Sequence, residues 1–169
     1  MPVMRILIAG VGNVLRGDDG FGVAVAHSLS QNYNRPNAIT LFEAGIAGIS
    51  LVQELMDGYD ALIIADAVER NGAPGTVYLI EPDIPDSSLI DSAALHSSLA
   101  DAHYTEPSKV LMLAKALGVL PPKVFIIGCQ PAGYDELGAE LSDAVKNAVQ
   151  VAVRRIESLI ESLNHQEKT

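Results

Sequence analysis

Aspartates that follow short apolar segments are the residues of this chain best suited to chemistry. Asp18 and Asp19 lie side by side in a glycine-rich stretch, residues 10–22, and Asp66 directly follows the apolar residues 61–65. Carboxylates that meet in one cleft repel one another, which favours a bound cation or a shared proton. A cap on a helix or turn would explain one acid of the pair, or Asp66 alone, but the second acid of the pair is surplus to that role. The pattern therefore predicts a cation site.

Histidine is the other candidate ligand in the sequence. The chain has four histidines, which are His27, His96, His103 and His165. His27 falls in a predicted helix and His165 in the C-terminal tail, so structural or solvated positions are expected for both. His96 and His103 lie in a polar segment that reads as a long loop, residues 82–105, and long loops are often functional. Carboxylates with one imidazole suit a borderline divalent ion such as Ni²⁺ or Zn²⁺, although a lone loop histidine is more often simply exposed.

A nucleotide site is the main competing interpretation of the glycine-rich stretch. Gly10 and Gly12 follow an apolar segment, as in dinucleotide-binding loops, but the third glycine of that fingerprint would fall on Leu15. Asp18 and Asp19 also stand where a phosphate would have to bind, and they would repel it. These two features disfavour nucleotide binding.

Composition narrows the classes of protein further. The chain is expected to form one domain, residues 1–169, with a disordered tail at residues 164–169. Apolar residues make up 49% of the chain, enough for a core, and the net charge of −10 disfavours nucleic acid and anionic lipid as partners. No stretch is long and apolar enough for a leader or a membrane span. The single cysteine, Cys129, excludes an internal disulfide, fits a cytoplasmic setting and reads as a small buried hydrophobe.

Short apolar runs and helical patterns alternate along the chain. Strands are expected at residues 4–9, 38–43, 61–65, 76–81 and 123–128. Helices are expected at residues 20–33, 49–56, 106–117 and 135–163. The connection between the third and fourth strands is too short for a helical crossover, so these two strands are expected to pair antiparallel. The pattern predicts an α/β sandwich with a mostly parallel sheet, in which ligands bind beyond the carboxyl ends of the strands.

The last predicted helix is long because a single apolar stripe runs along it. The members of the stripe alternate steps of three and four residues, and they are Leu137, Leu141, Val145, Ala148, Ala152, Ile156, Leu159 and Leu163. Such a stripe is typical of a helix that packs on the core.

Several segments of the chain together resemble the [NiFe]-hydrogenase maturation endopeptidases. The first is Gly10-Val-Gly-Asn-x-Leu-x-x-Asp18-Asp19-Gly20-x-Gly22, a run specific to that family, and Glu43-Ala-Gly45 and Ala65-Asp66-Ala67 follow it. His103-x-x-x-Pro107 resembles the segment that holds the family's histidine, and Gly128-x-Gln130-Pro131 resembles the motif after its last core strand. The similarity spans about residues 4–160.

The resemblance implies a fold, an activity and a site. The implied fold is a three-layer α/β sandwich, in which a twisted, mixed, mostly parallel sheet of five strands has helices on both faces. The implied enzyme is an endopeptidase that removes a short C-terminal extension from a hydrogenase large-subunit precursor, after nickel has been inserted into that precursor. By motif match, the metal-reading and catalytic residues are Asp19, Asp66 and His103. Asp18 and His96 remain alternatives for the first acid and for the histidine.

Nickel is implied as a part of the substrate rather than as a resident cofactor, and another divalent ion is expected to substitute for it. Two mechanisms are open: either nickel held by Asp19, Asp66 and His103 polarises a carbonyl or a water, or the carboxylates act as general acid and base, as in an aspartic protease. The implied partner is the precursor, with no nucleic acid, no membrane insertion and a monomeric chain. A non-catalytic nickel-binding or metal-centre chaperone module is the alternative function, and turnover distinguishes it from the enzyme.

Overall fold

The secondary structure confirms the predicted alternation of strands and helices. The computed structural model describes residues 3–32, 36–46, 48–86, 107–133, 137–138 and 140–166. Its elements are β1 (Ile6–Val11), the 3₁₀ helix η1 (Gly17–Gly20), α1 (Phe21–Asn32), β2 (Ile39–Gly45), α2 (Gly48–Leu55), β3 (Ala61–Ala67), β4 (Val77–Ile80), α4 (Pro107–Ala116), β5 (Lys123–Cys129) and α5 (Asp143–Gln166).

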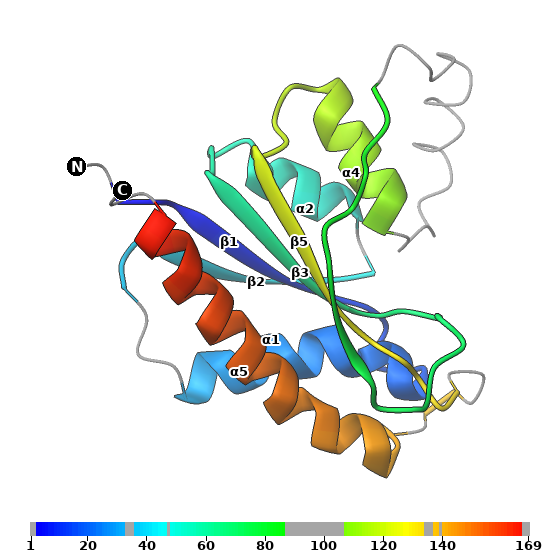
Figure 1. Cartoon of the computed structure of the whole chain (residues 1–169). Helices are drawn as coiled ribbons and strands as arrows, with labels where there is room; N and C mark the ends of the chain where they lie inside the picture. The colour runs from blue at the N-terminus through cyan, green and yellow to red at the C-terminus, as the bar shows by residue number, and fades with distance from the viewer. Residues whose placement is uncertain are drawn as a thin grey trace, which may run out of the picture.

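A five-stranded sheet forms the centre of the molecule, in the order β2-β1-β3-β5-β4 (Figure 1). The pairs β1–β2, β1–β3 and β3–β5 are parallel, and β4 pairs antiparallel with β5. The mixed, mostly parallel sheet is therefore confirmed. The predicted pairing of the third and fourth strands is wrong, because β5 lies between β3 and β4. Burial explains the order: β5 ends in four buried residues, whereas no residue of β4 is buried, so the less buried strand lies at the edge.

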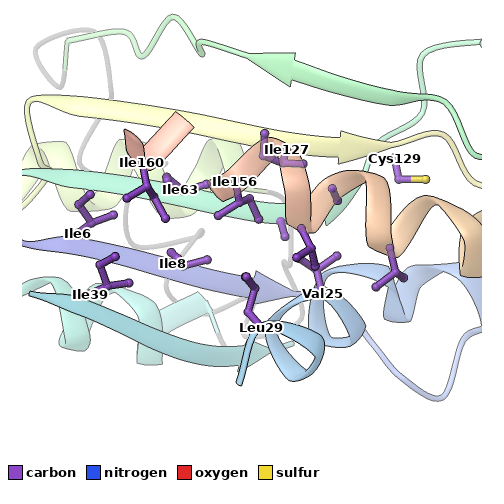
Figure 2. Close-up of a cluster of buried hydrophobic side chains, with 14 of the residues drawn as sticks. Ile6, Ile8, Val25, Leu29, Ile39, Ile63, Ile127, Cys129, Ile156 and Ile160 are labelled. Carbon is purple, nitrogen blue, oxygen red and sulfur yellow. The ribbon is translucent and has the colours of Figure 1, made fainter. Parts of the chain in front are cut away.

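Each face of the sheet carries its own hydrophobic core. Successive side chains of a strand point to opposite faces, so Ile6 and Ile8 of β1 pack with α1 and α5, while Leu7 and Ala9 pack with α2 and α4. Figure 1 shows the two pairs of helices on opposite faces, and Figure 2 shows the first core, where side chains of the strands, α1 and α5 meet. This arrangement confirms the predicted sandwich. No helix within the described residues combines the length and the apolar character that a membrane crossing needs.

The parallel strands run further toward their carboxyl ends than the sequence predicts. β1 continues to Val11 and pairs there with Gly45, the last residue of β2. β3 continues to Ala67, and within it Asp66 pairs with Gly128. Glycine and aspartate read as loop residues, but the parallel pairing extends through them. Asp66 therefore lies inside a strand, where pairing with β5 fixes its backbone.

The helix predicted over residues 135–163 begins later and ends later than expected. Gly138 adopts a left-handed backbone with φ of +80°, and Leu137 is 83% exposed, so neither belongs to the helix. α5 begins at Asp143 and continues through residues 164–166, which were expected to be disordered, and the rest of the tail lies outside the described residues. The helical spacing of apolar residues continues in the sequence across Gly138, but the left-handed backbone of this glycine interrupts the helix.

Helix α1 lies directly on the backbone of β1 and β3. A Cβ on Gly22, the second residue of α1, would overlap the carbonyl oxygens of Val11 and Ala65. A Cβ on Gly10 of β1 would in turn overlap the carbonyl oxygen of Gly22. The two glycines therefore set the distance between the helix and the sheet at the end where the chain leaves β1.

The substitution Gly22→Ala should destabilise the fold by about 3 kcal/mol or more, because the new methyl group has to push α1 off the sheet. Urea unfolding at neutral pH measures this loss. Gly133→Ala is the matched control, since its Cβ would meet no atom within 4 Å, and it should stay within about 1 kcal/mol of the parent chain. Equal stability of the two variants would contradict the close packing of α1.

Candidate active site

Asp66 lies at the edge of the sheet where ligands of such folds are expected. β1 is flanked by β2 on one side and by β3 on the other, so the connections that follow β1 and β3 lead away from each other. In an open parallel sheet, this switch point leaves a crevice beyond the carboxyl ends of the strands. Asp66 is only 5% exposed there, which is unusual for a carboxylate.

The chain that leaves β1 folds back and places Asp19 beside Asp66. Gly12 has a φ of +133°, and a Cβ on it would overlap the carbonyl oxygen of Asp19, so only glycine fits at this turn. The N–H of Asn13 donates to Oδ2 of Asp19 at 3.1 Å. The same added Cβ would lie 3.8 Å from Oδ1 of Asp66, so Gly12 lies next to both acids. The loop thus carries the half-buried Asp19 to the end of β3.

The two acids interact electrostatically. Burial and, after it, the negative charge of Asp19 raise the pKa of the Asp66 carboxyl to about 8, although a hydrogen bond from the backbone of Ala67 partly opposes the rise. Asp66 therefore holds a proton at neutral pH. A divalent cation between the acids would offset both causes of the raised pKa by its positive charge, and it would release this proton.

Asp18 has a different environment from Asp19. Its Oδ2 accepts hydrogen bonds from the N–H of Ala132 at 2.8 Å and of Gly133 at 3.3 Å, and from Oγ of Ser142 at 2.9 Å. Its Oδ1 accepts from the N–H of Ser142 at 2.7 Å. Asp18 is buried and joins the β1 loop to the segment between β5 and α5. Asp18 thus has a structural role, although it caps neither its own helix nor its own turn.

A buried glutamine, Gln130, holds the segment that follows Asp66. Its Oε1 accepts from the N–H of Arg70 at 2.8 Å and of Gly72 at 3.1 Å, and its Nε2 donates to Oε1 of Glu69 at 2.8 Å. Its backbone pairs with Gly75 and with Thr76. The sequence indicated Gln130 only as part of a motif after the last strand, and nothing in the pattern revealed that it anchors the loop from β3 to β4.

Cys129 is buried at the end of β5, as predicted. Burial, and then the negative charge of Asp18, raise the pKa of its thiol to about 11. A thiol with this pKa is almost entirely protonated at neutral pH, so it is a poor nucleophile.

The histidines fall into two groups. His27 is exposed on α1, where its Nδ1 lies 4.0 Å from Oε1 of Glu43, and His165 lies in the last turn of α5, far along that helix from the acids. His96 and His103 lie outside the described residues. Within the described ranges, no three residues among His, Cys, Asp and Glu are grouped so that they could hold a metal ion. The described part of the site is therefore the carboxylate pair.

A hollow of about 580 Å³ lies elsewhere, at the amino end of β5. Its lining includes Glu81, Lys115 and Lys123. It opens at the edge of the sheet opposite to Asp66, so it is separate from the carboxylate pair.

The geometry of the glycine-rich loop argues against a phosphate site. In a dinucleotide-binding loop, glycines let the phosphate approach the backbone closely. Here the carbonyl oxygen of Asp19 lies against Gly12, and two aspartates occupy the 3₁₀ helix that follows. The arrangement suits a cation or a proton transfer, because a half-buried carboxylate and a buried one converge there.

Comparisons with known proteins agree on one family. The family model described as "Hydrogenase maturation protease" matches residues 23–159. The chain is 35% identical over 154 residues to the hydrogenase expression/formation protein HoxM of Azotobacter vinelandii, covering 91% of this chain and 71% of the relative. It is 31% identical over 156 residues to the hydrogenase 2 maturation protease of Escherichia coli, covering 90% of this chain and 88% of that protein. Among solved structures, the hydrogenase maturating endopeptidase HybD of Escherichia coli aligns with a TM-score of 0.73 at 27% identity, covering 94% of this chain and 93% of that chain.

The buried carboxyl of Asp66 should make the stability of the protein fall as pH rises. The folded pKa of about 8 exceeds the usual value of 3.8, so between these two values the folded state binds more protons than the unfolded state. The free energy of unfolding should therefore decrease by up to about 1.4 kcal/mol per pH unit in this window. Urea unfolding of the parent chain and of Asp66→Asn, compared between pH 5 and pH 8.5, measures the effect.

Asp66→Asn keeps the shape of the neutral acid and removes its titration. Its stability should change much less with pH than that of the parent chain. Parallel pH profiles for the two proteins would show that Asp66 is already ionised at low pH in the folded state.

Proposed function

The chain belongs to the hydrogenase maturation protease family and is a peptidase, and from this premise we propose that it removes the C-terminal extension of a nickel-loaded [NiFe]-hydrogenase large-subunit precursor. The observation that carries the proposal is the buried Asp66 beside Asp19 at the carboxyl edge of the sheet. Such a pair is unfavourable without a proton or a cation, and the nickel centre of a precursor supplies the cation.

Asp19, Asp66 and His103 are the residues proposed to contact the nickel of the substrate. Asp19 is preferred to Asp18 because the hydrogen bonds of Asp18 to Ala132 and Ser142 already occupy both of its carboxylate oxygens. α4 begins at the same edge of the sheet, because it ends shortly before the amino end of β5. His103 precedes α4 by four residues in the sequence, which supports its choice. Two carboxylates and an imidazole suit nickel or another borderline divalent ion.

The reaction adds one water across a peptide bond, giving a new carboxylate on the matured subunit and a new amino group on the released peptide. The nickel of the substrate would polarise the scissile carbonyl or the water. In the alternative mechanism, in which nickel does not contact Asp66, this residue keeps its proton at neutral pH and is suited to donate it to the departing nitrogen. Asp19 lies beside it and is suited to orient the water. A nickel chaperone that does not cut remains the second candidate, and the protease relatives favour the enzyme.

The deciding assay is cleavage of the host's hydrogenase large-subunit precursor, read by intact mass. The nickel-loaded precursor should lose a C-terminal peptide, and the nickel-free precursor should stay intact, because the metal completes the electrostatics of the acidic pair. Many turnovers per protein molecule identify an enzyme. Stoichiometric binding of the nickel-loaded precursor without any loss of mass would instead identify a chaperone. Equal cleavage of the loaded and the nickel-free precursor would show that nickel is not needed for recognition of the substrate.

Alanine at Asp19, Asp66 or His103 should each lower the cleavage rate at least a hundredfold, while circular dichroism shows an intact fold. His27→Ala is the control among histidines, and Cys129→Ala the control among nucleophiles; both should keep normal activity. Asp18→Ala should differ from Asp19→Ala, because it removes four hydrogen bonds and should lower stability. Loss of activity in His96→Ala but not in His103→Ala would transfer the role to His96.

A further inference from the structure

Large apolar side chains are exposed on segments near the carboxyl ends of the strands, the end of the sheet at which Asp66 lies. They come from three segments: the loop after β1, the stretch from the residue after β2 to the first turn of α2, and the short turn before α5. We call these side chains the apolar rim; they are Val14, Leu15, Ile46, Ile49 and Leu137. Single exposed apolar residues are ordinary on a protein surface, but a group of them at one edge marks an interaction site.

Backbone hydrogen bonds bring the three segments of the apolar rim together. The N–H of Gly12 donates to the carbonyl of Gly45 at 2.9 Å, which joins the loop after β1 to the end of β2. The N–H of Gly138 donates to the carbonyl of Leu15 at 2.8 Å, which joins the turn before α5 to the same loop. Each member of the rim lies within a few residues of one of these bonds. The rim is therefore a fixed feature of the edge and not a set of unrelated side chains.

The same loop also carries Asp19. The N–H of Asn13, next to Val14, donates to the Asp19 carboxylate, and Gly12 lies against the Asp19 carbonyl. An extended peptide advances about 3.3 Å per residue. A peptide bond held at Asp19 and Asp66 therefore places the neighbouring residues of that peptide over the rim.

The core does not use these side chains. α2 buries Leu51, Val52 and Leu55 against the sheet, whereas Ile49 at its first turn is 52% exposed. Leu15 keeps its side chain in solvent while its backbone holds the loop. In a chain with a net charge of −10, an apolar edge around two acids is a distinct surface.

We propose that the apolar rim docks apolar side chains of the hydrogenase precursor on either side of the bond that is cut. This inference rests on the proposed function and adds to it the chemistry of the substrate segment. The acids contact the nickel of the precursor, and the apolar rim binds the precursor residues on either side of the cut bond. Docking of this kind strengthens the binding of the precursor and does not change the rate of the chemical step.

The test compares substitutions in the apolar rim with a substitution just beyond the far end of α2. The double variant Leu15→Gln with Ile49→Gln removes apolar surface from the rim. The control is Met56→Gln, which is 59% exposed just after α2, at the opposite edge of the sheet. With nickel-loaded precursor, the double variant should raise KM about tenfold, since each buried apolar side chain contributes strongly to binding, and it should keep kcat within about twofold. Met56→Gln should change neither constant.

The outcomes separate this inference from the proposed function. If the parent chain cuts the precursor and the double variant has the KM of Met56→Gln, docking on the rim is wrong and the function stands. A drop in kcat with an unchanged KM also overturns docking, because it shows damage to the Asp19 loop. If the parent chain cuts no precursor, the proposed function fails. Calorimetric measurement of binding to the same precursor then decides whether the apolar rim docks it. Weaker binding by the double variant alone then supports docking, and equal or absent binding overturns it.

Discussion

A carboxyl group buried beside a second carboxylate is the constraint on which the rest of this structure depends. Asp66 is inside a strand, so it cannot move away from Asp19 without breaking the pairing between β3 and β5. Asp19 is held by the N–H of Asn13 and by close contact with Gly12. The fold therefore keeps together two groups that repel each other when both are charged, and the energy stored in that arrangement is available to whatever cation or proton relieves it.

Backbone contacts, more than side-chain packing, hold this pair in place. Gly22 lets α1 lie on the carbonyls of β1 and β3, and Gly12 lets the loop return to the sheet. Gln130 fixes the segment after Asp66 through three hydrogen bonds of its side chain. Contacts of this kind are short and directional, so they leave little freedom to the loops at the carboxyl edge. Backbone contacts and the polar side chains of Asp18 and Gln130 hold those loops, and their apolar side chains remain unburied.

The sequence predicts the layers and the acids well, because both depend on local patterns. Apolar runs identified the five strands, and Asp19 and Asp66 lie together at the carboxyl ends of the strands, as their positions in the sequence predicted. The position of β5 between β3 and β4 was not predictable, since it depends on which strand is buried more deeply in the finished sheet. The start of α5 was missed because apolar spacing continues across Gly138. The separate environments of Asp18 and Asp19 were also not predictable, because the partners of Asp18 lie more than a hundred residues away in the chain.

These distant partners determine when the site can form during folding. Ala132 and Ser142 are separated from Asp18 by 114 and 124 residues, so the β1 loop cannot be fastened until β5 has joined the sheet and α5 has begun. Contacts between residues so far apart close large loops and form slowly. A chain emerging from the ribosome exposes its acidic motif first and organises it last. The order of assembly therefore delays activity until the whole domain has been made.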